Sequence, residues 1–350
     1  MTEPVYEKLA DALSSRGGLM PSIKCKEFFA MVEELFTPEE AELATKLPLS
    51  PIPAETFAKE IGGDPKEVES LLENMANKGL VFTQERSGVR FYNLMALVLG
   101  IVEVQFMGGE VSDRTRKIAH LFEDYGNALR KLAAAAPTPT PTGTAVSPPS
   151  RVVTVEKEIP GGTEVQPYDK VSEFIAKYDS ISVSTCYCRH QGELLGRPCD
   201  KPKDVCISFG PWSRYVAERG FGRLVSKEEA LQILDRAEKA GLVHLTNNDA
   251  EHTEFICNCC VCHCPILGSI KNAAVPSMVA TSSFIASLEE GDCSGCGDCV
   301  ELCQMDALTM EDDIAALDAE RCIGCGVCVS VCPTGALRLE LREGAPVPSH

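Results

Sequence analysis

Two cysteine motifs near the end of the 350-residue chain restrict its fold more than any other feature of the sequence. Each has the spacing C-x₂-C-x₂-C-x₃-C, and the second repeats the first at an offset of 29 residues, from Cys293 to Cys322. Four thiols at this spacing are typical ligands of an iron–sulfur cluster, so the surrounding backbone must wrap two such groups. The eight cysteines are Cys293, Cys296, Cys299, Cys303, Cys322, Cys325, Cys328 and Cys332.

The distribution of cysteine also indicates metal rather than disulfides. The chain has 18 cysteines, and Cys25 is the only one before residue 186. No run of about 18 apolar residues is present to span a membrane, and the first ten residues lack the apolar core of a secretory signal. A cytoplasmic location is therefore expected, and clustered cysteines in that reducing compartment are typical metal ligands.

The repeated motif resembles the bacterial dicluster ferredoxins over about residues 283–342. The resemblance implies two [4Fe–4S] clusters, with the fourth cysteine of each motif bound to the other cluster. Strands at 284–286 and 336–339 would pair into a small βαβ-type shell. The sequence departs from the family where Gln304 follows a cysteine in place of the usual proline. One cluster would take Cys293, Cys296, Cys299 and Cys332, and the second would take Cys322, Cys325, Cys328 and Cys303.

Nine further cysteines in the middle of the chain do not have this spacing. They exceed what one tetrahedral zinc ion can use, so the sequence predicts two sites or one large cluster, either separate or sharing ligands. One or two further iron–sulfur clusters are the main interpretation. Structural zinc is an alternative, and redox-active thiols without metal are another. The candidate ligands are Cys186, Cys188, Cys199, Cys206, Cys257, Cys259, Cys260, Cys262 and Cys264.

Basic residues lie among the middle cysteines, where they would raise the potential of a bound cluster. Two histidines, His190 and His263, support another interpretation, in which an unusual cluster in this region is itself catalytic. The basic residues are Arg189, His190, Arg197, Arg214, Arg219 and Arg223.

The first 131 residues predict a mostly helical domain with one hairpin. Thr37 and Asp64 each precede a proline, a pattern typical of helix N-caps. The order of helices followed by a two-stranded hairpin resembles a winged helix-turn-helix over residues 37–93. Winged helices commonly bind DNA, but these 131 residues hold 21 acidic against 15 basic side chains, and the whole chain has a net charge of −18. DNA binding requires Lys and Arg to neutralise phosphates, so the charge favours protein docking over a nucleic-acid partner.

The predicted fold class is α+β and multidomain. A winged-helix-like docking domain is expected at residues 1–131, followed by an Ala/Pro/Thr linker at 132–150. A cysteine-rich domain follows at 151–282, and the ferredoxin-like module with its tail at 283–350.

These features predict a cytoplasmic iron–sulfur protein or subunit, typical of anaerobic metabolism, that passes single electrons to or from a partner oxidoreductase. No nucleotide-binding loop or nucleophile–base pair is recognisable, so the chemistry is expected on the partner, a flavoprotein or metal-cofactor enzyme, and the chain itself is expected to be a non-catalytic subunit. A redox-sensing transcription regulator that uses the winged helix is one alternative. An oxidoreductase with a non-standard cluster on the middle cysteines is the other.

Overall fold

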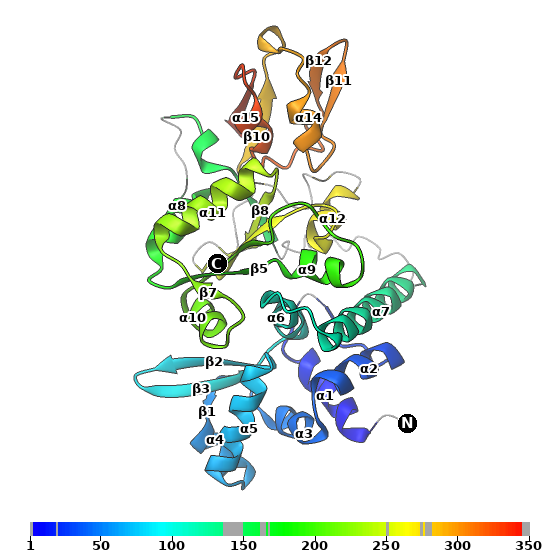
Figure 1. The fold of residues 1–350 in the computed structure, drawn as a ribbon, viewed down its shortest axis with the longest axis vertical. Helices are drawn as coiled ribbons and strands as arrows, with labels where there is room; N and C mark the ends of the chain where they lie inside the picture. Colours follow the sequence, from blue (N-terminus) through cyan, green and yellow to red (C-terminus); the bar gives the residue numbers. More distant parts are fainter. Residues whose placement is uncertain are drawn as a thin grey trace. The chain divides into compact units, whose positions relative to one another are not determined.

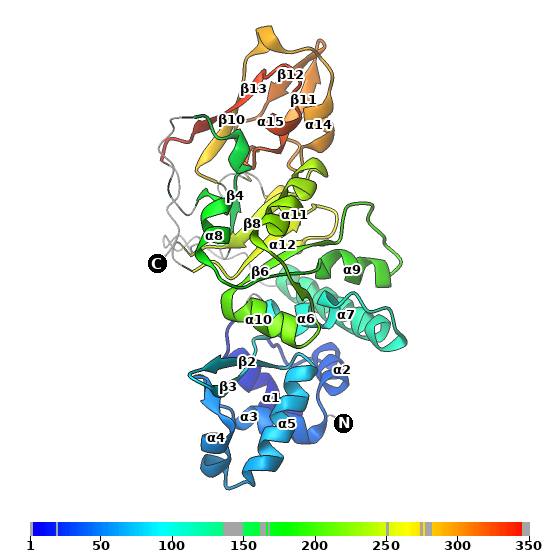
Figure 2. The same ribbon diagram turned by 60° about the vertical axis from the view of Figure 1, so that its left-hand side comes forward.

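The chain forms two compact units that are interleaved along the sequence. A computed structural model describes residues 3–18, 20–135, 150–161, 166, 169–249, 252–273, 276 and 282–344. The first unit comprises residues 1–144, 190–198 and 215–222, and the second comprises 145–189, 199–214 and 223–350. Two segments of the middle region therefore belong with the N-terminal residues, and the rest of it shares one unit with the C-terminal motifs. Each unit combines helices with a sheet, which confirms the mixed helix-and-sheet class (Figure 1; Figure 2).

The first unit is mainly helical with one small antiparallel sheet. In that sheet, β3 is the central strand and pairs with β1 and β2. An irregular segment at Leu97–Ile101 leads into α6. The elements are α1 (Pro4–Ser14), α2 (Lys26–Leu35), α3 (Pro38–Lys46), β1 (Ile52–Pro53), α4 (Ala54–Ile61), α5 (Pro65–Asn77), β2 (Val81–Arg86), β3 (Val89–Leu94), α6 (Val102–Met107) and α7 (Asp113–Ala135).

The predicted helix starts are confirmed by their capping contacts. The Thr37 side chain accepts a hydrogen bond from the Glu40 N–H, and the Glu40 carboxylate accepts one from the Thr37 N–H, which completes a capping box. The Asp64 side chain accepts from the N–H groups of Lys66 and Glu67 at the start of α5. The expected hairpin is formed by β2 and β3.

Residues 215–222 pack against α5 and the hairpin within the first unit. Arg219, whose side chain is only 5% exposed, donates hydrogen bonds to Glu73 and Asn77 of α5, at 2.7 Å in each case. The ring of Tyr215 lies 5.2 Å from that of Phe82, measured between centroids. These contacts cover one side of α5.

Most of the predicted linker falls outside the described residues. Residues 136–149 are not described, so the expected extended Ala/Pro/Thr segment stays a prediction. Helix α7 continues to Ala135, a few residues past the predicted end of the first domain.

The second unit is built on a six-stranded antiparallel sheet in the order β4-β8-β9-β6-β5-β7. Helices α9 and α10 begin in this unit and end in segments of the first. The sheet and its helices are β4 (Ser150–Val153), α8 (Val171–Lys177), β5 (Ile181–Thr185), α9 (Tyr187–Leu194), β6 (Asp204–Phe209), α10 (Gly210–Glu218), β7 (Arg223–Leu224), α11 (Lys227–Lys239), β8 (Val243–Asn247), β9 (Phe255–Cys259) and α12 (Pro265–Lys271).

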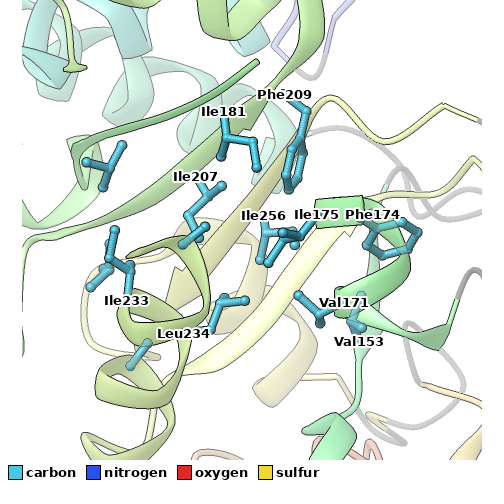
Figure 3. Close-up of a cluster of buried hydrophobic side chains, with 14 of the residues drawn as sticks. Val153, Val171, Phe174, Ile175, Ile181, Ile207, Phe209, Ile233, Leu234 and Ile256 are labelled. Carbon is cyan, nitrogen blue, oxygen red and sulfur yellow. The ribbon is translucent and has the colours of Figure 1, made fainter. Parts of the chain in front are cut away.

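Two apolar cores lie on opposite faces of this sheet. Alternate residues of a strand point to opposite faces, and in β4 Val153 belongs to one core while Val152 belongs to the other. The first core joins the sheet to α8 and α11, and its members include Phe174 of α8, Ile207 of β6 and Leu234 of α11 (Figure 3). The second core includes Leu267 and Ile270 of α12 together with residues of the C-terminal module. Cysteines occur in both cores.

The C-terminal module consists of two short helices and two antiparallel strand pairs. Strand β10 pairs with β13, as predicted, but the pairing is antiparallel, so the expected βαβ-type shell is wrong. A parallel pair needs a crossover connection on one side, whereas here the chain leaves β10, forms a β11–β12 hairpin between the two helices, and returns as β13. The elements are β10 (Phe284–Leu288), α14 (Asp298–Leu302), β11 (Leu308–Glu311), β12 (Ile314–Leu317), α15 (Val327–Val331) and β13 (Leu337–Leu341).

Within the described ranges, none of the helices combines the length and the apolar character needed to cross a lipid bilayer.

Candidate metal centres

Four of the C-terminal cysteines line one cavity. It is bounded by the first three cysteines of the first motif and by the last cysteine of the second, together with apolar side chains such as Leu288 and Ala315. The cysteines are Cys293, Cys296, Cys299 and Cys332. Burial raises the pKa of the Cys299 thiol, and the neighbouring sulfurs of Cys296 and Cys332 raise it further. The last cysteine of the second motif therefore lies with the first three cysteines of the first motif.

The remaining four C-terminal cysteines are neighbours in the same way. Burial raises the pKa of the Cys325 thiol to about 12, and the sulfurs of Cys303 and Cys322 contribute to the rise. Cys328 has its pKa raised by burial and then by Cys325, Cys322 and Cys303, with a further contribution from Cys299 of the first site. Thiols with such high pKa values keep their protons at neutral pH unless a metal binds them, because a bound metal ion stabilises the thiolate.

The backbone between these cysteines fits the close approach of a cluster. Gly295 and Gly324 occupy the same place in the two motifs, and both have a positive φ, of 70° and 69°. A Cβ at Gly295 would lie 2.5 Å from the carbonyl oxygen of Asp313, and one at Gly324 would lie 2.7 Å from the carbonyl carbon of Phe284. Only glycine fits either loop, so both loops can fold tightly around a [4Fe–4S] group.

The loop of the second motif is also held by hydrogen bonds from elsewhere in the second unit. The carbonyl oxygen of Gly324 accepts from the hydroxyls of Thr154, at 2.8 Å, and Ser282, at 2.7 Å. The Val155 N–H donates to the carbonyl oxygen of Cys325 at 3.0 Å. This loop is thereby fixed to the end of β4.

Gln304, which replaces the usual proline, connects the C-terminal module to the middle cysteines. Its side-chain oxygen accepts from the Val261 N–H at 3.0 Å, and its side-chain nitrogen donates to the carbonyl oxygen of Gly241 at 2.9 Å. A proline could make neither bond. The departure from the family pattern therefore has a structural reason that the sequence alone did not give.

Six of the nine middle cysteines form one group, here called the six-thiol set, in which four are buried and Cys186 and Cys257 are partly buried. Its members interact in a continuous series in which Cys186 contacts Cys188, Cys188 contacts Cys264, Cys264 contacts Cys259, Cys259 contacts Cys257 and Cys257 contacts Cys206.

The period of the sheet explains why these distant cysteines meet. Cys257 and Cys259 are two residues apart in β9, so their side chains project from the same face. In β6, Val205 and Ile207 belong to the core on the other face, which leaves Cys206 on the face of Cys257. Because Ile207 pairs with Ile256 in antiparallel register, Cys206 lies opposite Cys257. The remaining three thiols come from α9 and its preceding turn and from the start of α12.

Thiols of the six-thiol set differ in how easily they ionise. Hydrogen bonds from Cys206 and Cys259 lower the pKa of Cys257 to about 5, despite its burial. Hydrogen bonding to Cys257 and burial raise the pKa of Cys206. The set therefore offers thiolates to a metal within an apolar surrounding.

The other three middle cysteines form a separate group with a histidine, here called the compact set. It consists of Cys199, Cys260, Cys262 and His263, whose ligand atoms all lie within 4.8 Å of one another. The sulfurs of Cys199 and Cys262 are 3.9 Å apart, and Nδ1 of His263 is 3.2 Å from the Cys262 sulfur. Cys260 directly follows Cys259, so it lies on the opposite face and belongs to the core with α8 and α11.

The structure therefore divides the middle cysteines differently from their order in the sequence. Cys199 lies apart from its sequence neighbours Cys188 and Cys206, and Cys260 and Cys262 lie apart from the other cysteines of their run. His263, which the sequence analysis named only in support of a catalytic cluster, is a member of the compact set. The alternation of side chains along a strand could have separated Cys260 from Cys259. No local signal, however, marks Cys199 as a partner of Cys260 and Cys262.

Of the basic residues named in the sequence analysis, Arg189 is the one in contact with the sulfurs. It is 1% exposed, and its Nη1 donates to the carbonyl oxygen of Asn258 at 3.0 Å and to the sulfur of Cys260 at 3.6 Å. Its Nε and Nη2 have no hydrogen-bond partner among the described residues. Burial lowers the pKa of Arg189, but the sulfurs of Cys186, Cys260 and Cys259 outweigh that effect and raise it.

The other basic residues are paired with polar groups elsewhere. Arg197 pairs with Glu123, and the Nε2 of His190 lies 2.9 Å from the carbonyl oxygen of Glu110, both within the first unit. Arg214, Arg219 and Arg223 pair with Asp179, Glu73 and Glu229. A buried guanidinium with unpaired donors beside thiols is expected where a negatively charged metal–thiolate group binds. The position of Arg189 therefore supports metal binding by the neighbouring cysteines.

Comparison with known proteins identifies one segment. A family model described as the 4Fe-4S dicluster domain matches residues 292–336, which include all eight C-terminal cysteines. No curated protein matches the chain, and no solved structure matches its fold. The chain thus carries a 4Fe-4S dicluster domain, which indicates iron–sulfur electron transfer with a redox partner.

Proposed function

We propose that this chain is an iron–sulfur electron-transfer protein or subunit that passes single electrons to or from a partner oxidoreductase. The observation that carries the proposal is the dicluster domain at residues 292–336. A bound [4Fe–4S] cluster supplies a one-electron redox couple. The role of the protein is then to hold the clusters, to exclude water from them and to present them to a partner.

In this proposal the ligands alternate between the motifs. Cys332 joins the first three cysteines of the first motif, which is supported by the cavity that these four residues line. Cys303 joins Cys322, Cys325 and Cys328, which is supported by their mutual effects on pKa.

The six-thiol set would hold one further cluster. Three of its members, Cys257, Cys259 and Cys264, pack in the same apolar core as the cysteines of the second C-terminal site. Cys303 and Cys328 belong both to this core and to the core around the first site. The candidate ligands therefore form one continuous apolar series through the second unit, which is the arrangement expected of a chain of redox centres.

The first C-terminal site would face the redox partner. Cys296 is exposed, whereas most of the other candidate ligands are at least partly buried. The turn between β11 and β12 contacts the loop at Gly295 and presents Glu311, Asp312 and Asp313 to solvent. An acidic surface beside the most accessible site favours a partner with a basic docking face.

The N-terminal region would be a winged-helix-like docking domain rather than a DNA reader. Its topology of α3, β1, α4, α5 and a hairpin supports the winged-helix assignment. Arg90, one of two hairpin arginines suited to phosphate contact, is paired with Glu73 and Glu218. Glu73 and Asn77 on α5 are bonded to Arg219. DNA would have to displace these contacts, and a mobility-shift assay at low salt that shows specific binding would overturn this part of the proposal.

Metal analysis and redox titration of anaerobically purified full-length protein test the proposal. Two C-terminal clusters and one in the six-thiol set predict about twelve irons and as many acid-labile sulfides per chain, whereas about eight would confine the clusters to the C-terminal motifs. The dithionite-reduced protein should show cluster EPR signals and reoxidise when it reduces methyl viologen or cytochrome c. Clusters that cannot be reduced, or that exchange no electrons with either acceptor, would refute electron transfer.

Double variants test the exchange of ligands. Cys296→Ser combined with Cys332→Ser removes two ligands of one cluster and should cost about four irons. Cys296→Ser combined with Cys303→Ser removes one ligand from each of two clusters and should perturb the EPR signals of both. The reverse pattern would mean that each motif binds its own cluster.

A further inference from the structure

The compact set has the dimensions of a site for one metal ion. A tetrahedral zinc ion binds thiolates at about 2.3 Å, which separates two ligand sulfurs by about 3.8 Å. The sulfurs of Cys199 and Cys262 are 3.9 Å apart, and the four ligand atoms all lie within 4.8 Å of one another. A [4Fe–4S] cube binds its cysteines through four different irons, which spreads the sulfurs further apart.

The remaining candidate ligands do not share this geometry. Among the described residues, which include all the other candidate cysteines, no second group of ligand atoms is this compact. The spacing therefore distinguishes the compact set from the sites proposed for iron–sulfur clusters.

The chemistry of the donors also fits zinc. Three thiolates and one imidazole form a complete tetrahedral shell, which is a common structural zinc site and leaves no position open for a substrate. Three thiolates around a divalent ion carry a net charge of −1, and the Arg189 guanidinium donates to Cys260 at 3.6 Å. The buried cation therefore balances the charge of the occupied site.

The site also has a structural task in this fold. Cys199 lies in the connection between α9 and β6, whereas the other three ligands lie between β9 and α12. That second loop carries Cys259 and Cys264 of the six-thiol set at its two ends, and its Val261 N–H bonds to Gln304 of the C-terminal module. A bound ion would tie the connection between α9 and β6 to this loop. It would thereby fix the path of the loop between the proposed redox centres.

We propose that Cys199, Cys260, Cys262 and His263 bind one structural zinc ion, separate from the iron–sulfur clusters. The site is independent of the proposed electron transfer, because its ligands are shared with none of the proposed clusters.

X-ray absorption at the zinc edge of the full-length, anaerobically purified protein tests the proposal directly, since iron does not contribute to that signal. We expect one zinc per chain, with a shell of three sulfurs at about 2.3 Å and one nitrogen at about 2.0–2.1 Å. Absence of zinc, iron in its place, or a shell with another composition would overturn the proposal. This measurement needs no variant, so it does not depend on the folding of one.

Substitutions then test whether these four residues are the ligands of the zinc ion. Cys262→Ser should remove the zinc and leave the irons of the two C-terminal sites in place. His263→Cys should retain zinc and convert the shell to four sulfurs. His252→Ala and Cys25→Ser are the matched controls, because His252 is an exposed histidine of the same unit and Cys25 lies outside the middle region. Both controls should retain the wild-type shell.

Zinc that persists in Cys262→Ser, or an unchanged shell in His263→Cys, would overturn the assignment. The two proposals fail separately, because the zinc edge reports on the compact set alone and the EPR signals report on the clusters.

Discussion

Substitution of Gly324 by alanine tests how tightly the backbone must close around the second C-terminal site. Gly324 lies between Cys322 and Cys325 with a φ of 69°. A Cβ there would lie 2.7 Å from the carbonyl carbon of Phe284 and nearer still to its oxygen. Either the cysteine loop or β10 must move to make room, and the carbonyl of Gly324 is itself held by Thr154 and Ser282.

The destabilisation expected for Gly324→Ala has two parts, and the same substitution at a second glycine separates them. Alanine in a left-handed conformation costs about 1–2 kcal/mol, and an extra methyl group in a packed interior costs typically about 1–3 kcal/mol. Gly335 has nearly the same φ, of 70°, but a Cβ there would meet no atom within 4 Å. Gly335→Ala should therefore show only the conformational cost, and Gly324→Ala should show both.

The assay compares wild type, Gly324→Ala and Gly335→Ala after anaerobic purification. For a unit of this size about 1 kcal/mol lowers Tm by about 2–4 °C, so Gly324→Ala should melt about 2–12 °C below Gly335→Ala. It should also retain less iron and acid-labile sulfide, because the displaced loop carries two of the proposed ligands. Equal Tm and equal iron content in the two variants would refute the packing argument.

Three further substitutions test other contacts. Gln304→Ala should leave the Val261 N–H without its partner, at a cost of about 1–3 kcal/mol, and hydrogen exchange of the peptide covering residues 257–264 should accelerate. Glu73→Gln should destabilise the first unit at pH 7 by about 1–2 kcal/mol after allowance for solvent screening, as measured by hydrogen exchange of the β2–β3 hairpin. Burial raises the pKa of Glu73, but its hydrogen bonds to Arg219, Tyr92 and Arg90 outweigh burial and lower the pKa from 4.5 to about 2; the stabilisation is therefore complete above pH 4.5 and lost as the pH falls towards 2. Arg189→Gln should lower the midpoint potential of the middle cluster in an EPR-monitored titration, because it removes a buried positive charge beside the sulfurs.

Controls for these substitutions come from the same elements. Glu69→Gln changes an exposed carboxylate of α5 and should leave the hairpin unaffected at any pH. Arg214→Gln removes an exposed arginine that pairs with Asp179 and should leave the midpoint potentials unchanged. A stability difference between Glu73→Gln and wild type that persists at pH 2, or a potential that does not respond to Arg189→Gln, would contradict the reasoning. For Gln304→Ala, unchanged exchange at Val261 would do so.

Much of the first unit was predictable because its signals are local. The caps at Thr37 and Asp64 depend on side chains that bond to the backbone two or three residues away. The hairpin follows from two apolar segments around a polar turn. The packing of residues 215–222 onto α5 was not predictable, since no pattern in the sequence links segments so far apart.

The C-terminal motifs illustrate what the sequence determines by itself. Their spacing predicts the ligand type and the number of sites, because one short loop must reach several corners of the same cluster. Even there, the antiparallel pairing of β10 and β13 was not predicted, because the direction of a strand pair depends on the path of the chain between its strands.

The middle cysteines were divided by the tertiary structure alone. Composition predicted metal binding by the nine thiols, but the six-thiol set and the compact set draw on segments as distant as Cys199 and Cys262. Which thiols meet depends on the alternation of strands across a sheet and on the register between β6 and β9. A ligand set is defined by distances, and those distances exist only once separate strands and loops have been brought together by the apolar cores on the two faces of the sheet.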